Sequence, residues 1–194
     1  MDGRERAELI SRDRAVIVAV DLQERLAPAI DGIEGVKRNA ARLLRAAAAL
    51  GAPVIFTEQY PKGLGPTDPA LRETAPAGEV MEKVHFGALG EPANASRFAE
   101  LRAEGRDQAV IFGTETHVCV LQTAMQLLAA GWTLFLAEDA CGSRRPADRE
   151  AGIARLAQAG ARRATVEMAM FELLARADTD DFRALLPLIR DDAG

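Results

Sequence analysis

Short apolar runs and longer segments with helical spacing alternate along the chain. The first run, residues 15–20 (AVIVAV), is apolar at every position, which is typical of a strand buried on both faces of a parallel sheet. Similar patterns predict further strands, and these comprise residues 52–59, 79–86, 107–113, 132–140 and 164–168. The segments between them predict helices, and these comprise residues 38–51, 94–105, 118–131, 147–160 and 171–176.

This alternation predicts an α/β fold. Strands separated by helices of about ten to fifteen residues form parallel sheets with helices on both faces. Length and spacing fit about six strands, so we expect a three-layer α/β/α architecture around a mostly parallel sheet. No repeat, low-complexity tract or linker divides the sequence. Residues 1–194 are therefore expected to form a single domain, of which residues 1–13 are a polar N-terminal arm.

Composition narrows the classes of partner. The 194 residues are 48% hydrophobic and 27% charged, and the formal net charge is -5. No stripe of lysine or arginine is present, which argues against nucleic acid or an anionic membrane. No apolar run approaches the roughly 18 residues of a membrane span, and the charged start, MDGRERAELISRDR, does not resemble a signal peptide. Two cysteines do not form a disulfide framework, so we expect a cytoplasmic protein.

Chemically useful side chains fall at the predicted carboxyl ends of strands, where parallel α/β sheets bind their ligands. Asp21 follows the first strand, and Lys83 lies in the third predicted strand. Cys119 follows the fourth strand and lies near the first turn of a helix. We expect these three side chains to meet at one edge of the sheet.

A thiol, a lysine and a carboxylate together suit nucleophilic attack on an amide-like carbonyl. The helix N-terminus and a neighbouring lysine would both favour the thiolate of Cys119. A carboxylate could take the thiol proton and pass it to the leaving group, and backbone N–H groups at the turn could hold an oxyanion. Each residue also has a structural interpretation: Cys119 as a small buried hydrophobe, Asp21 as a turn cap and Lys83 as a surface cation.

Four motifs occur in a fixed order along the chain, and they are DLQ (21–23), EKVHFGAL (82–89), GTETHVCVLQT (113–123) and DACGSR (139–144). Together they resemble the acid, lysine and nucleophile motifs, and a further segment, of the isochorismatase-like cysteine hydrolases. The resemblance covers nearly the whole chain.

The resemblance implies a six-stranded sheet between helices and a mechanism. Cys119 would be the nucleophile, Asp21 the proton shuttle and Lys83 the charge that orients both. The family places a non-proline cis peptide shortly before its nucleophile, which corresponds to the bond between Thr114 and Glu115. The N–H groups of Glu115 and Cys119 would form the oxyanion hole. Water activated by Asp21 would finally hydrolyse the thioester.

Two departures from the family's patterns narrow the expected function. Nicotinamidases carry a metal site with a D-x-H motif and further histidines after the second strand, whereas this chain has TEQYPKG (57–63) there. With only His85 and His117, a three-histidine site is impossible within one chain, so we expect no metal and no cofactor. True isochorismatases lack the cysteine. These features favour the metal-free subgroup of poorly defined substrate over a nicotinamidase or isochorismatase proper.

Polar and aromatic residues near the motifs are candidates for binding a small-molecule substrate, and they are Gln23, Gln59, Tyr60, Phe86 and His117. Turn or packing roles are the alternative for each of them. Family members commonly form oligomers, so we expect a homo-oligomer. The apolar tail, residues 168–191, is its candidate contact.

We predict a cysteine-dependent hydrolase that cleaves a small amide or related C–N bond through a thioester. One alternative is a non-hydrolytic redox sensor, in which a low-pKa Cys119 would have Cys141 as its resolving partner. An inactive scaffold is another. The presence of Asp21 and Lys83 favours the hydrolase, because a sensor needs only the thiol.

Overall fold

The fold is built on one parallel sheet. A computed structural model describes residues 8–190, so residues 1–7 of the predicted arm lie outside it. The strands are β1 (Ala15–Val20), β2 (Val54–Gln59), β3 (Glu79–Lys83), β4 (Gln108–Thr114), β5 (Thr133–Gly142) and β6 (Arg162–Ala164). They lie in the order β3-β2-β1-β4-β5-β6, and every neighbouring pair is parallel. The predicted six-stranded parallel sheet is therefore confirmed.

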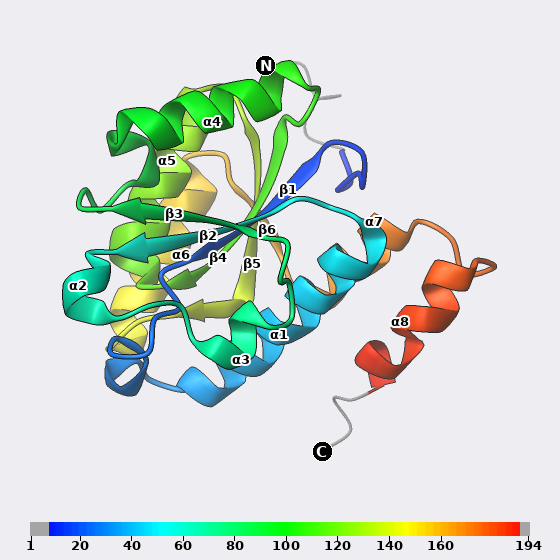
Figure 1. Cartoon of the computed structure of the whole chain (residues 1–194), viewed down its shortest axis with the longest axis horizontal. Helices are drawn as coiled ribbons and strands as arrows, with labels where there is room; N and C mark the ends of the chain where they lie inside the picture. The colour runs from blue at the N-terminus through cyan, green and yellow to red at the C-terminus, as the bar shows by residue number, and fades with distance from the viewer. Residues whose placement is uncertain (1–7, 191–194) are drawn as a thin grey trace.

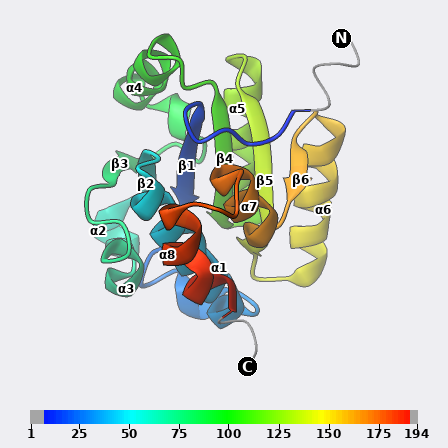
Figure 2. The same ribbon diagram turned by 90° about the vertical axis from the view of Figure 1, so that its right-hand side faces the viewer.

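Helices cover both faces of this sheet. They are α1 (Ile33–Leu50), α2 (Pro61–Leu64), α3 (Pro69–Arg72), α4 (Pro92–Ala103), α5 (Leu121–Ala129), α6 (Pro146–Gln158), α7 (Val166–Leu174) and α8 (Asp180–Arg190). Helices α4, α5 and α6 lie on one face, and α1 and α7 lie on the other, with α8 packed outside α1 (Figures 1 and 2). The predicted three-layer architecture is thus confirmed. Within residues 8–190, no helix is long and apolar enough to cross a membrane.

Three further helical turns lie between these elements. Two of them are 3-10 turns, at Ala27–Ala29 and Ala88–Gly90. The third is a π-helical turn, Thr116–Val120, which leads directly into α5. A π-helical turn of this kind is frequently found at a functional site.

The two central strands determine where a site can form. Every residue of β1 and of β4 is buried, because helices cover both faces of the sheet. β1 continues through α1 to β2 on one side, whereas β4 continues through α5 to β5 on the other. The chain paths therefore diverge at the carboxyl ends of β1 and β4, which is where open α/β sheets bind ligands.

The end of the sheet differs from the prediction. The predicted strand at residues 164–168 is wrong, because β6 already ends at Ala164. Thr165 then caps α7, and its hydroxyl accepts a hydrogen bond from the Met168 N–H at 3.2 Å. The β-branched residues that suggested a strand instead begin a helix.

Several helix starts also differ from the prediction. α1 begins at Ile33, five residues before the predicted start at residue 38, directly after Gly32 in a left-handed conformation (φ 63°). α4 begins at Pro92, where the fixed φ of proline suits the first helical turn. The loop after β2 contains two short helices, α2 and α3, for which the sequence pattern gave no indication.

Candidate active site

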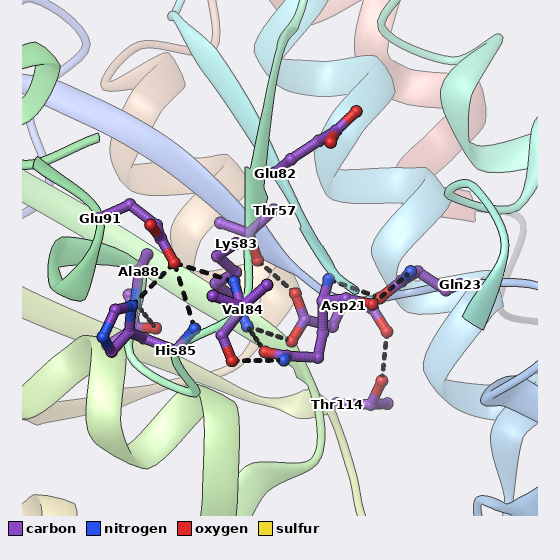
Figure 3. Close-up of polar contacts among 12 residues, drawn as sticks. Asp21, Gln23, Thr57, Glu82, Lys83, Val84, His85, Ala88, Glu91 and Thr114 are labelled. Carbon is purple, nitrogen blue, oxygen red and sulfur yellow. Dashed lines mark hydrogen bonds and ion pairs between the residues drawn. The ribbon is translucent and has the colours of Figure 1, made fainter. Parts of the chain in front are cut away.

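Asp21 lies directly after β1, in a position fixed by both neighbouring strands. Its backbone has a left-handed φ of 49°, and its N–H donates to the Thr57 carbonyl of β2 at 3.0 Å. The Thr57 hydroxyl donates to Asp21 Oδ1 at 2.6 Å. From β4, the Thr114 hydroxyl donates to the backbone carbonyl of Asp21 at 2.7 Å. These contacts hold a fully buried carboxylate at the carboxyl edge of the sheet (Figure 3).

Lys83, the last residue of β3, reaches the same carboxylate. Its Nζ lies 2.6 Å from Asp21 Oδ2, and both side chains are 0% exposed. The same Nζ donates to Gln59 Oε1, at the end of β2, at 2.8 Å. The expected meeting of Asp21 and Lys83 at one sheet edge is therefore present as a buried ion pair (Figure 3).

The Cys119 thiol interacts with both members of this pair. The residue lies in the π-helical turn before α5 and is 6% exposed. Burial raises the pKa of the thiol, the Asp21 charge raises it further, and Lys83 opposes them only in part. Lys83 favours the thiolate as expected, but burial of the charged form outweighs this effect, so the net pKa of the thiol is raised and not lowered. Cys119 is a neutral thiol at neutral pH.

The Asp21 carboxyl is tuned in the opposite way from an ordinary ion-paired acid. Burial raises its pKa, and the charge and hydrogen bond of Lys83, with the Thr57 hydroxyl, only partly offset this effect. Asp21 therefore accepts a proton more readily than an exposed aspartate does. Such a shift suits a group that takes up and returns a proton during a reaction.

The segment from Thr114, at the end of β4, to Cys119 is held by contacts with residues at and after the end of β5. The peptide bond between Thr114 and Glu115 is cis. The Glu115 carboxylate accepts hydrogen bonds from the backbone N–H and from Nε of Arg144, each at 3.0 Å. The Thr116 hydroxyl donates to the carbonyl of Gly142 at 2.9 Å. These contacts tie the turn that carries Cys119 to the end of β5.

The two predicted glutamines have different surroundings. Gln23 is fully buried, and its amide is occupied by backbone groups: it accepts from the Gln59 N–H at 2.8 Å and donates to the Gln59 and Gly65 carbonyls. This arrangement favours a role in holding the loop after β2. Gln59 instead contacts Lys83, so its side chain belongs to the polar cluster itself.

The remaining predicted substrate contacts lie around the cluster. Tyr60 and Phe86 are 54% and 53% exposed, on the segments that directly follow β2 and β3. His117 turns toward α6, with Nδ1 at 3.1 Å from Ser143 Oγ and Nε2 at 4.0 Å from Asp148. None of the three has a hydrogen bond to Asp21 or Lys83 among the described contacts.

Two threonines of the site were not assigned from the sequence. Thr57 and Thr114 both contact Asp21, through its carboxylate and its backbone respectively. Both lie on strands that flank β1: Thr114 is the last residue of β4, and Thr57 lies two residues before the end of β2. Their positions at or near the carboxyl ends of strands could have indicated them, but their contact with Asp21 depends on the order of strands in the sheet, which a single sequence does not state.

The cysteines and acids of residues 8–190 include no group of three or more ligands arranged to hold a metal ion. Cys119 and Cys141 are both free and buried. Cys141 donates to the Ala137 carbonyl at 3.4 Å, and burial raises its pKa to about 12. The second thiol is therefore held within the sheet, on β5.

The described geometry agrees with a comparison against protein families. The model of the Isochorismatase domain matches residues 15–168. The chain belongs to the isochorismatase family. Isochorismatase domain-containing protein 2A of Mus musculus is 34% identical over 182 residues, which are 92% of this chain and 84% of that protein. Isochorismatase domain-containing protein 1 of Salmo salar is 37% identical over 178 residues, which are 92% of this chain but 62% of that protein.

Solved structures of the family share the whole fold. The MAR1 ribonuclease of Caenorhabditis elegans superposes with a TM-score of 0.88 at 32% identity, over 96% of this chain and 95% of that one. The YcaC gene product of Escherichia coli, an octameric hydrolase of unknown specificity, has a TM-score of 0.86 at 24% identity, over 95% and 92% of the chains. This chain therefore has the fold of the isochorismatase-family hydrolases, and the resemblance inferred from its four motifs is confirmed at that level.

Proposed function

We propose that this protein is a cysteine-dependent hydrolase that cleaves a small amide or related C–N bond. Cys119 is the nucleophile, Asp21 the proton shuttle and Lys83 the positive charge that orients both. One observation carries the proposal: a fully buried ion pair, with Nζ and Oδ2 2.6 Å apart, lies against a thiol at the carboxyl edge of the sheet. Burying such a pair costs desolvation energy that a hydrophobic pair would not, and perturbed groups of this kind concentrate at functional sites.

The first half of the reaction forms a thioester. The neutral thiol of Cys119 passes its proton to Asp21 as Sγ bonds to the substrate carbonyl carbon. The N–H groups of Glu115 and Cys119 stabilise the resulting oxyanion. The C–N bond then breaks, and the proton on Asp21 moves to the departing amine.

The second half regenerates the enzyme. A water molecule gives a proton to Asp21 and attacks the thioester carbon. The C–S bond breaks, the carboxylic acid leaves, and the proton returns from Asp21 to Cys119. Lys83 stabilises whichever of the carboxylate and the thiolate is negative at each step. No step needs a metal or an organic cofactor.

The proposal extends to the residues that contact the substrate and to the assembly. Tyr60, Phe86 and His117 lie on segments around the cluster and would contact a small substrate, while Gln59 would contact it only through Lys83. A homo-oligomer is proposed as well, in line with the octameric YcaC relative. The net charge of -5 makes an RNA substrate, which the name of the Caenorhabditis elegans relative suggests for that protein, the less favoured choice here.

The redox-sensor alternative is less well supported. A resolving cysteine must reach the oxidised thiol, and Cys141 is held inside β5 by its contact with Ala137. Burial raises its pKa to about 12, so it has little thiolate with which to attack a sulfenic acid. A sensor also has no use for the buried Asp21–Lys83 pair.

Turnover of a panel of small amides, with a single-stranded RNA included, tests the proposal. Wild type should release amine or ammonia from at least one amide, and Cys119→Ala and Asp21→Asn should each lose turnover by more than roughly a thousandfold. Cys141→Ala, which removes the other buried thiol, should keep wild-type turnover. Turnover retained in Cys119→Ala, or cleavage of the RNA alone, would overturn the proposal.

A further inference from the structure

Residues 84–91 follow Lys83 at the end of β3 and make hydrogen bonds to α5, the helix that follows Cys119. Near its far end, the Ala88 N–H donates to Thr123 Oγ1 at 3.1 Å and the Leu89 N–H donates to Gln126 Oε1 at 2.9 Å. Both acceptors belong to α5, which continues directly from the turn that carries Cys119. The segment therefore spans the two elements that supply the lysine and the nucleophile.

One carboxylate oxygen holds the near end of this segment. Glu91 Oε1 accepts hydrogen bonds from the Val84 N–H at 2.9 Å, the His85 N–H at 3.2 Å and His85 Nδ1 at 2.8 Å (Figure 3). The first of these bonds is the main reason that the pKa of Glu91 falls to about 2. Glu91 is therefore ionised across the physiological range, and its charge is committed to the two residues directly after Lys83.

The Val84 peptide is held from its other side by the site itself. Its carbonyl accepts from Gln59 Nε2 at 2.8 Å, and the oxygen of the same amide accepts from Lys83 Nζ at 2.8 Å. A glutamine amide has its acceptor on one end only. Because Gln59 Nε2 donates to the Val84 carbonyl, its Oε1 points toward Lys83. If the Val84 carbonyl moved, the Gln59 amide would lose the hydrogen bond that holds it in this orientation.

We propose that Glu91 is a positioning residue, which fixes the Val84–His85 peptides so that Gln59 orients Lys83 toward Asp21 and Cys119. Glu91 touches neither the substrate nor the reacting atoms. It acts through a continuous series of hydrogen bonds, from its carboxylate to Val84, to Gln59 and to Lys83. This role rests on the function proposed above for Lys83 and Cys119.

The test follows the alkylation of Cys119 by iodoacetamide across pH, read by intact mass in a Cys141→Ala background, so that no substrate is needed. Lys83 lowers the thiol pKa, and a misplaced Lys83 should therefore move the profile to higher pH. Glu91→Ala should alkylate roughly tenfold more slowly at a fixed pH below the midpoint, the effect of one pKa unit. Glu91→Gln, which keeps an acceptor oxygen without the charge, should show a smaller change.

Two further variants make the outcomes distinct. Glu79→Ala removes a surface acid of β3 instead, one that accepts from Arg97 Nε at 3.0 Å, and it should leave the profile unchanged. Lys83→Met should move the profile at least as far as Glu91→Ala. If Lys83→Met moves it and neither Glu91 variant does, the positioning role is overturned while the function proposed for Lys83 stands. If Lys83→Met also leaves it unchanged, both are overturned. If Glu91→Ala does not fold, Glu91→Gln decides.

Discussion

Asp21, Lys83 and Cys119 lie at the centre of the site, and the pKa values of Asp21 and Cys119 depend on their neighbours in this group. Asp21 and Lys83 are fully buried and 2.6 Å apart, and they shift the pKa of the Cys119 thiol in opposite directions. The residue types and their strand-end positions were predictable from the sequence. The direction of the net thiol shift was not, because the degree of burial, which raises the pKa most, depends on the packing of the finished fold.

Removal of each charged partner should move the reactivity of Cys119 in a different direction. In wild type, the alkylation profile should lie above the pH of about 8.5 expected of a free thiol, because the pKa of Cys119 is raised. Asp21→Asn removes a negative charge and should move the profile to lower pH, whereas Lys83→Met should move it higher. Iodoacetamide labelling with peptide mapping measures both, and shifts in the same direction would contradict this electrostatic account.

The different roles of Gln23 and Gln59 could not be distinguished from the sequence. The sequence predicts that both Gln23 and Gln59 contact substrate, yet the Gln23 side chain bonds to backbone groups and Gln59 bonds to Lys83. A loop glutamine next to a motif looks the same in either role. Only the position of the loop after β2, which brings Gly65 to Gln23, separates them.

At the scale of elements, the close approach of β1 and β4 brings Asp21 beside the turn of Cys119. Gly113 makes this approach possible at the end of β4. Its φ is 124°, and a Cβ at this position would lie 2.1 Å from the carbonyl oxygen of Val20. No rotation of a side chain could relieve that contact, because the obstacle is backbone.

Gly113→Ala should therefore destabilise the protein by about 3 kcal/mol or more, through steric overlap and an unfavourable backbone conformation. Gly105→Ala is the matched control, since its φ is also positive (91°) but its Cβ would meet nothing within 4 Å. It should lose only about 1 kcal/mol. Urea unfolding measures both variants, and equal losses would show that the approach of the two strands is not the cause.

Element boundaries were predictable where residue type decides the local conformation and uncertain where packing decides it. β1 was predicted at its observed bounds because each of its residues is apolar and buried. The end of the sheet was mistaken because Thr165 can extend a strand or cap a helix, and its contact with Met168 selects the cap. Short helices α2 and α3 lie in a loop rich in glycine and proline, whose path depends on contacts distant in sequence.

At the scale of the whole molecule, the alternation of strands and helices was sufficient to predict the three-layer architecture. The strand order was not predictable in the same way, and this order places Asp21, directly after β1, between Thr57 on β2 and Thr114 on β4. The exterior carries apolar side chains as well. Met168 and Phe171 on α7 are 47% and 42% exposed, within the tail predicted to make subunit contacts.

Sedimentation should therefore give a native mass that is a multiple of the 20.8 kDa chain. The double variant Met168→Ser and Phe171→Ser should lower that mass, because it removes exposed apolar area from α7. Val80→Ser removes an exposed apolar side chain from the edge strand β3 instead, and it should leave the mass unchanged. A monomeric wild type would contradict the proposed assembly, and dissociation by Val80→Ser alone would place the contact at β3.

The most direct test of the central claim is peptide mass spectrometry of the acyl-enzyme formed with p-nitrophenyl acetate. Its leaving group needs no proton, and Asp21→Asn removes a charge that raises the thiol pKa, so solvent can take the thiol proton. Asp21→Asn should therefore still acylate Cys119, more slowly than wild type, but without Asp21 to activate water the acetyl thioester should persist. Wild type should show the adduct only transiently, and Cys119→Ala should show none at this site. Ester turnover retained in Cys119→Ala, with acetyl groups found only on other residues and Cys119 never modified in wild type, would contradict the account.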